Sequence, residues 1–168
     1  MRCPNCQHDN ISGVDICESC GSDLGALDVP QPTSGLQHSI LTTLLSEIPK
    51  SDPNTLQRDA TVADAIALMR SSRHGVTLIV DDDNTLVGIF TEADLVHRVG
   101  IDAEPETISI IDVMTPAPYS LGPADSMAHA LNAMAVGNHR HIAIAAGRKP
   151  IGQLSVRNVL AYLRETVL

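Results

Sequence analysis

The sequence predicts a mixed α/β fold. It consists of two copies of one helix-and-strand repeat, preceded in the chain by a small cysteine-rich module. Three observations lead to this prediction. All four cysteines lie within the first 20 residues, and an apolar pattern recurs at an offset of 64 to 65 residues. Within each copy, helical and strand periodicities alternate, which is typical of helices that flank a small sheet.

The composition indicates a globular chain with a core of aliphatic residues. The 168 residues are 43% apolar but include only one Phe, two Tyr and no Trp. No stretch approaches the roughly 20 apolar residues of a membrane span. The opening "MRCPNC" does not form the apolar centre of a secretory signal. We therefore expect a soluble, cytoplasmic protein without a membrane partner.

The net charge of −9 argues against a general affinity for nucleic acid or anionic membrane, because such binding depends on Lys and Arg. The charge is unevenly distributed. Residues 1–35 hold one basic and five acidic side chains, and residues 36–112 hold five and thirteen, whereas residues 113–168 hold five and two. An anionic ligand is therefore expected to prefer the last third of the chain.

The four cysteines form two Cys-x-x-Cys turns separated by ten residues, as Cys3, Cys6, Cys17 and Cys20. Two such pairs complete the tetrahedral thiolate shell that zinc prefers, with bonds of ~2.3 Å. So short a segment buries too little apolar surface to fold alone, so the metal would have to supply its folding free energy. Because four protein ligands leave no open position, we expect structural rather than catalytic zinc.

Residues 1–24 resemble the short zinc-ribbon modules found in many bacterial and archaeal proteins. Two disulfides are disfavoured in a chain without a secretion signal. A redox dithiol and iron held by the same sulfurs remain as alternatives. The acidic charge of the segment favours a protein contact over nucleic acid.

Residues 25–35, "GALDVPQPTSG", lack periodicity and are rich in Pro, Gly and Ser, so a flexible linker is predicted there. The apolar residues that follow have helical spacing up to Pro49, which predicts a helix over residues 36–48. Its apolar stripe is expected to pack on the body of the protein.

The repeat aligns "TVADAIALM", residues 61–69, with "SMAHALNAM", residues 126–134, and "GIFTEADL", residues 88–95, with "GQLSVRNV", residues 152–159. Each copy predicts a helix, a β-branched strand, a polar turn, a second strand and a second helix. Thr91 and Ser155 fall where the second strand passes into the second helix, at a position that favours N-cap residues. We therefore expect a capped strand-to-helix turn, called a corner below, at Thr91 and at Ser155.

Together these motifs resemble a pair of CBS domains, the regulatory unit also called a Bateman module. The resemblance rests on both repeats, on "DVMTPAPYSL" at residues 112–121, which matches the entry strand of such domains, and on "NHRHIAI" at residues 138–144. It implies two β-α-β-β-α repeats with pseudo-twofold symmetry, residues 36–111 and 112–168. It also implies a homodimer formed through the helices of the repeats.

CBS pairs commonly bind adenosine-containing ligands in clefts between the repeats, and the resemblance implies such a ligand here. Thr91 and Asp94 match the hydroxyl and carboxylate expected to hold a ribose, since a carboxylate accepts strong hydrogen bonds from ribose hydroxyls. The second repeat has Ser155 and Asn158 instead. Because Asn is neutral and has one strong acceptor, the two sites are predicted to be unequal.

The phosphate of such a ligand needs cations, and the basic third of the chain offers Arg140 and His141 at the start of a predicted strand. Val76 and Ile142, which begin the first strand of each repeat, complete the set of residues predicted to contact the ligand. His139 and His141 share one strand face, which raises a metal site as a minor alternative.

The sequence offers no glycine-rich phosphate loop, nucleophile elbow or paired metal-binding histidines on a helix, so we do not predict an enzyme. The run Asp81 to Asp83 is expected to be a solvated turn. The favoured function is a sensor of AMP, ADP or ATP-like ligands that signals to a protein partner. The alternative is an interaction or transcription-associated protein whose clefts are purely structural.

Overall fold

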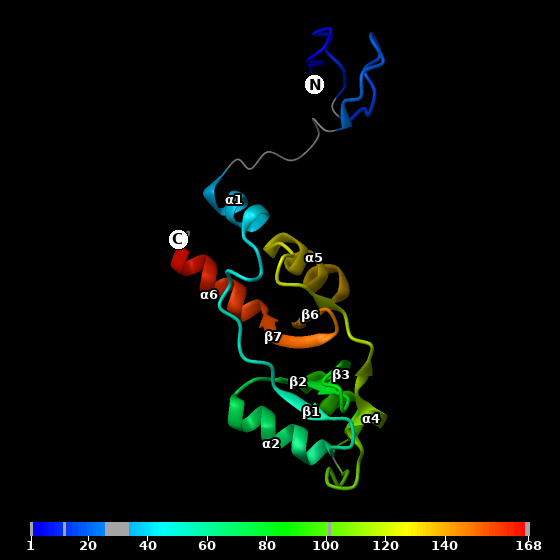
Figure 1. Cartoon of the computed structure of the whole chain (residues 1–168), viewed down its shortest axis with the longest axis vertical. Helices are drawn as coiled ribbons and strands as arrows, with labels where there is room; N and C mark the ends of the chain where they lie inside the picture. The colour runs from blue at the N-terminus through cyan, green and yellow to red at the C-terminus, as the bar shows by residue number, and fades with distance from the viewer. Residues whose placement is uncertain (1, 12, 26–33, 101, 167–168) are drawn as a thin grey trace. The chain divides into compact units, whose positions relative to one another are not determined.

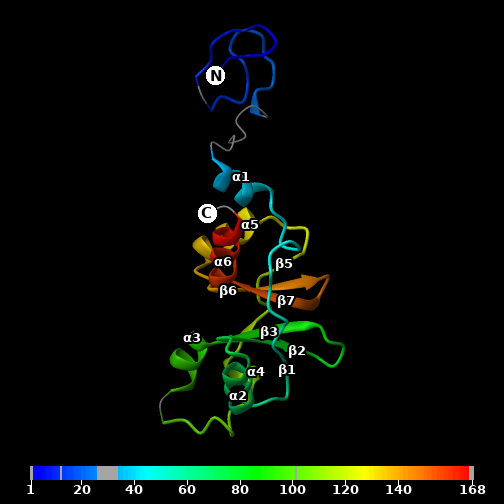
Figure 2. The same cartoon turned by 90° about the vertical axis from the view of Figure 1, so that its left-hand side faces the viewer.

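The computed structural model describes residues 2–11, 13–25, 34–100 and 102–166. It divides the chain into two compact units, Met1–Gly35 and Leu36–Leu168, which Figures 1 and 2 show from two directions. Most of the predicted linker, residues 25–35, lies outside the described residues. Of the helices described, none has the length and apolar character needed to cross a bilayer.

The first unit consists of two similar cysteine turns. The Cys3 N–H donates to His8 O (2.9 Å) and the Cys17 N–H donates to Ser22 O (2.8 Å), at a spacing of fourteen residues. Each turn ends on a residue with positive φ, Gln7 at 62° and Gly21 at 69°. A glycine adopts this conformation without the steric cost that a side chain brings. Leu24 is fully buried beside Cys3 and Cys17 and forms the small core.

The second unit begins with helix α1 (Gly35–Thr42), and two repeats follow. The first is β1 (Thr55–Gln57), α2 (Val62–Ser72), β2 (Val76–Val80), β3 (Leu86–Thr91), α3 (Glu92–Asp94) and the π-helical turn η2 (Leu95–Val99). The second is β5 (Ser120–Leu121), α5 (Met127–Gly137), β6 (His141–Ala146), β7 (Lys149–Ser155) and α6 (Val156–Thr166). Between them lie α4 (Ile110–Val113) and β4 (Thr115–Pro116). The predicted mixed fold of two β-α-β-β-α repeats is confirmed.

The strands form two small sheets. The first has the order β1-β2-β3-β4 and the second β5-β6-β7, and in each the leading strand runs parallel to the next one while the other neighbours are antiparallel. Both views show α2 and α4 on the outer face of the first sheet and α5 and α6 on the outer face of the second. The inner faces meet where Val76, Leu78 and Ile89 pack with Ala143.

The repeats share local details that the sequence patterns did not predict. Helices α2 and α5 both end on a left-handed residue, Arg73 with φ 58° and Asn138 with φ 52°. Both sheets carry an irregularity in register at corresponding points, between Ile79 and Val80 and between Ile144 and Ala145. The two copies therefore correspond in backbone geometry as well as in sequence.

The helix predicted over residues 36–48 was too long, because α1 ends at Thr42. Beyond it the backbone pairs with the segment that precedes α5. The Leu45 N–H donates to Asp125 O and the Met127 N–H donates to Thr43 O (2.9 and 2.8 Å). Leu45 and Ile48 then enter the core under α5 and α6. This long-range pairing replaces the remaining helical turns.

The entry strand expected over residues 112–121 was also wrong as one element. It consists of the end of α4 and two separate two-residue strands, and β4 pairs with β3 in the first sheet whereas β5 pairs with β6 in the second. Ala117, between Pro116 and Pro118, has φ 46° and breaks the extended chain. The segment therefore crosses from one sheet to the other.

Candidate functional site

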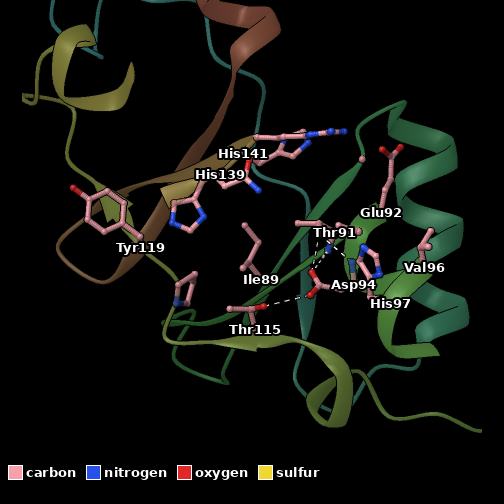
Figure 3. A pocket seen from close by; sticks show the side chains of 15 residues that line it. Ile89, Thr91, Glu92, Asp94, Val96, His97, Thr115, Tyr119, His139 and His141 are labelled. Carbon is pink, nitrogen blue, oxygen red and sulfur yellow. Dashed lines mark hydrogen bonds between the residues drawn. The ribbon is translucent and has the colours of Figure 1, made fainter. Parts of the chain in front are cut away.

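A pocket of about 590 Å³ lies between the two repeats, and Figure 3 shows its side chains. The first repeat supplies the end of β3, the helix after it and the start of β2. The second supplies the approach to β6, and the crossing segment supplies a further wall. The lining residues are Gly75, Ile89, Thr91, Glu92, Ala93, Asp94, Val96, His97, Thr115, Pro118, Tyr119, Asn138, His139, Arg140 and His141.

The corner between β3 and α3 is a capping box. The Thr91 hydroxyl accepts from the Asp94 N–H (3.3 Å), and Asp94 Oδ2 accepts from both the Thr91 N–H (2.9 Å) and the Thr91 hydroxyl (2.7 Å). The box satisfies backbone donors that a helix start leaves unpaired. It also holds the Asp94 carboxylate at the pocket wall, with one oxygen fully engaged.

The second carboxylate oxygen, Asp94 Oδ1, has only long contacts: 3.4 Å to Thr115 Oγ1 and 3.4 Å to Arg98 Nε. The Arg98 guanidinium is itself fixed, because Nη1 donates to Val113 O (3.0 Å) and Met114 O (2.7 Å). Arg98 therefore helps to hold the Asp94 carboxylate in place through a long ion pair. Asp94 Oδ1 remains an available acceptor on the pocket wall.

The corner between β7 and α6 repeats this geometry with an amide. Asn158 Oδ1 accepts from the Ser155 N–H (2.9 Å) and hydroxyl (2.6 Å), and the Ser155 hydroxyl accepts from the Asn158 N–H (3.3 Å). The only oxygen of the side chain is thus used in the capping box. Where Asp94 keeps an acceptor, Asn158 has an NH₂ donor.

The predicted site residues are only partly brought together. Thr91, Asp94, Arg140 and His141 line the pocket, whereas Ser155 and Asn158 lie at the other corner. Val76 and Ile142 are each 1% exposed and belong to the core rather than to the pocket wall. Both side chains therefore point inward, toward packed neighbours, whereas His141, the first residue of β6, lines the pocket.

Several pocket residues were missed by the sequence analysis, among them Thr115, Tyr119 and Glu92. Tyr119 Oη lies 2.9 Å from His129 Nε2, and His129 Nδ1 lies 3.3 Å from Asp125 Oδ1. The ring of Tyr119 is within 11° of parallel to that of His139, with centroids 6.4 Å apart. The two prolines around Ala117 were the signal that the chain turns toward the pocket here.

Charged and titratable side chains gather at one end of the pocket, where Figure 3 shows both His141 and Glu92. Burial lowers the pKa of the His141 imidazole, and the nearby charges of His74, Arg140 and Arg157 lower it further, while Glu92 acts in the opposite direction. A neutral His141 is therefore favoured, and Arg140 is the permanent cation of this end.

The four cysteine sulfurs of the first unit form a second candidate site. All lie within 4.8 Å of one another, and the Cys3–Cys20 and Cys6–Cys17 sulfur pairs are each 3.6 Å apart. A tetrahedral shell with bonds of ~2.3 Å places its sulfurs roughly 3.8 Å apart, so the cluster can hold a metal ion. The site residues predicted for a metal are thus brought together.

Polar neighbours support these sulfurs. The Asn10 amide, 6% exposed, donates to Cys17 Sγ (3.5 Å) while its oxygen accepts from the Glu18 N–H (3.0 Å). The hydroxyl and N–H of Ser22 lower the pKa of the Cys20 thiol to about 6. A backbone hydrogen bond at His8 lowers the pKa of the Cys6 thiol, but the neighbouring Cys20 sulfur, together with burial and the other two sulfurs, outweighs it and raises that pKa to about 11. Hydrogen bonds that favour a thiolate prepare it as a metal ligand.

Fold and site together define a pair of similar α/β repeats with a pocket between them, and a cysteine cluster in a separate unit. The CBS domain model matches the chain twice, over residues 45–100 and 110–165. The chain belongs to the CBS-domain family.

Known proteins with similar sequence or structure agree with this assignment. The arabinose 5-phosphate isomerase of Escherichia coli is 30% identical over 105 residues, which are 62% of this chain but only 32% of the isomerase. A CBS domain protein from Pyrobaculum aerophilum, solved as a complex with AMP, superposes with a TM-score of 0.64 at 20% identity and covers 74% of this chain and all of its own. The structure of CBSX2 in complex with AMP superposes with a TM-score of 0.61 at 19% identity, and the match covers 73% of this chain and 96% of CBSX2. These two likenesses show the fold.

The lowered pKa of His141 predicts a pH-dependent contribution to stability. Because the folded state binds the His141 proton less readily than the unfolded chain, stability is lost as the pH falls below the unfolded pKa of about 6.5. We expect the melting temperature of His141→Gln to fall less between pH 7.5 and 5.5 than that of the wild type, measured by calorimetry without ligand. His139→Gln, which removes a neighbouring exposed imidazole, is the control. Equal slopes for all three proteins would contradict the prediction.

Removal of metal tests the cysteine cluster. We expect chelation, or Cys17→Ser, to abolish protection of the first unit from amide hydrogen exchange, because the small core around Leu24 cannot replace a metal that contributes about 10 kcal/mol or more. Exchange in residues 36–166 should stay unchanged. Ser19→Ala, in the same turn, is the control. Retained protection in metal-free protein would refute a structural metal.

Proposed function

We propose that this protein is a non-catalytic sensor of adenosine-containing ligands, AMP, ADP or ATP-like, which bind in the pocket between its CBS repeats. The observation that carries the proposal is the acceptor Asp94 Oδ1, held only by long contacts on the wall of a pocket to which both repeats contribute. The AMP complexes of two proteins with the same fold support this class of ligand.

The ribose is assigned to the Thr91 corner. One ribose hydroxyl donates to Asp94 Oδ1, which has capacity because its present contacts are long. The second hydroxyl has Thr115 Oγ1 as a neighbouring polar partner. A charged acceptor makes such hydrogen bonds stronger than neutral ones, which suits a ligand site open to water.

The phosphate and the base are assigned to other parts of the same pocket. Arg140 and His141 offer donors to a phosphate, and no hydrogen bond or ion pair engages Arg140 within the described chain. The nearly parallel rings of Tyr119 and His139 offer faces on which an adenine can stack. Stacking of a base on an aromatic side chain contributes about 1–3 kcal/mol.

Signalling follows from the shared pocket. A ligand that contacts Asp94 on one repeat and Arg140 on the other binds one relative arrangement of the repeats better than others, and it shifts the population toward that arrangement. No catalytic step is needed for this role. Exposed apolar side chains on α5 and α6, Val136 and Leu160, support a homodimer formed through these helices.

The cysteine cluster is assigned to structural zinc, since four thiolates complete its preferred shell. Ile11 and Ile16 lie between the two cysteine turns and are 72% and 62% exposed. Exposed isoleucines on a small acidic unit support a contact with a protein partner. We propose that this unit carries the regulatory contact of the sensor.

Asp94→Asn tests the ribose assignment without removing the cap. The second corner shows that Asn forms the same capping box. Because the ion pair with Arg98 is long, the variant should keep its stability to within about 1 kcal/mol while it loses the acceptor Oδ1. We expect AMP affinity, measured by isothermal titration calorimetry, to fall about tenfold or more. Unchanged affinity in a folded variant would overturn the assignment. Asp64→Asn, at the capping box of α2, is the matched control.

The reciprocal change tests the inequality of the two corners. The wild type is expected to bind one AMP per chain, because Asn158 offers no acceptor beyond its capping box. Asn158→Asp restores that acceptor, and we expect a second, weaker binding event in the same titration. Two equivalent sites in the wild type would show that the acceptor at this position does not limit binding.

A further inference from the structure

We propose that Glu92 is a specificity-determining residue that restricts the ligand to one with a single phosphate. The inference rests on the proposed nucleotide function and concerns a feature that the sequence analysis left open, the number of phosphates. Glu92 lines the pocket, and Figure 3 shows its carboxylate at the end where His141 also lies.

The position of Glu92 is fixed by a close approach to the backbone. Its N–H donates to Gly75 O (3.1 Å), and its carboxylate atoms lie 2.5–2.7 Å from where a Cβ of residue 75 would stand. A side chain at position 75 would therefore require the Glu92 carboxylate to move from this place. The Glu92 side chain is exposed, and its carboxylate lies beside the start of β2 where it lines the pocket.

The Glu92 carboxylate is uncompensated. It makes no hydrogen bond or ion pair with any residue that the structure describes, and Arg140 is the permanent cation at the same end of the pocket. One phosphate can be balanced by Arg140. Each further phosphate adds negative charge that the Glu92 carboxylate repels. The residues that line the pocket include no second permanent cation to balance that charge.

The local fold does not require a carboxylate here. Val156 stands at the position of the second corner that corresponds to Glu92, and that corner forms the same capping bonds. A role as a helix-start charge is also weak, because α3 spans only Glu92–Asp94 before the π-helical turn. The charge is therefore left for the pocket and its ligand.

The test compares adenosine, AMP, ADP and ATP by calorimetric titration in magnesium-free buffer, for the wild type and Glu92→Gln. For the wild type we expect AMP to bind most tightly and ATP least. In the variant we expect the affinity for adenosine to be unchanged within twofold. The ratio of the AMP affinity to the ATP affinity should fall by about fivefold or more, which is the size expected for a unit charge acting over several ångströms.

Two further variants make the result specific. Glu104→Gln removes the same charge from an exposed site outside the pocket lining and should leave every ratio unchanged. Glu92→Val copies the second corner and should reproduce the effect of Glu92→Gln, with melting curves to verify that both proteins are folded. An AMP-to-ATP ratio that is the same in Glu92→Gln and the wild type would overturn this inference alone. Failure of the wild type to bind any of the four ligands would instead overturn the proposed function and this inference with it.

Discussion

The strand-to-helix corner is the constraint on which the pocket depends. In both repeats a strand passes directly into a helix, and a hydroxyl and the side chain three residues later satisfy the backbone at the turn with the same three hydrogen bonds. This requirement uses one oxygen of Asp94 and the only oxygen of Asn158. The second polar atom of the side chain is not needed for the capping box. It is an acceptor oxygen in Asp94 and a donor nitrogen in Asn158, so the fold tolerates opposite hydrogen-bonding chemistry at equivalent positions.

The pocket exists because the two sheets pack against each other and one segment crosses between them. Leu78 and Ala143, which correspond in the repeat, pair a large with a small side chain at the interface. The break at Ala117 lets β4 and β5 join different sheets and brings Thr115 and Tyr119 to the pocket. A ligand in this position would contact both repeats and the segment that joins them, and it would shift the population toward the arrangement that it binds best.

The sequence predicted what depends on local periodicity. The alternation of helical and strand patterns placed β2, β6, α2 and α5 closely, and the preference for Thr and Ser at N-caps located both corners. It failed where distant backbone decides the outcome, as at Thr42, where pairing with the segment before α5 ends the helix. Arg98 and Tyr119 were missed because no repeat or spacing marks them. Arg98 reaches Asp94 through the π-helical turn, and Tyr119 reaches the pocket through the crossing segment.

The side chains of the two corners have diverged. From first to second repeat, Glu92 corresponds to Val156, Ala93 to Arg157 and Asp94 to Asn158, so the carboxylates lie at the first corner and a cation at the second. On the strand before the corner, Ile89 corresponds to Gln153. Gln153 is 3% exposed, and neither polar atom of its amide has a hydrogen-bond partner in the described chain. A buried, unpaired amide costs about 1–3 kcal/mol, whereas Ile89 packs at the same interface without that cost. Stability alone therefore does not account for Gln153, and the side chains of the two corners have diverged while the backbone geometry of the repeats has stayed the same.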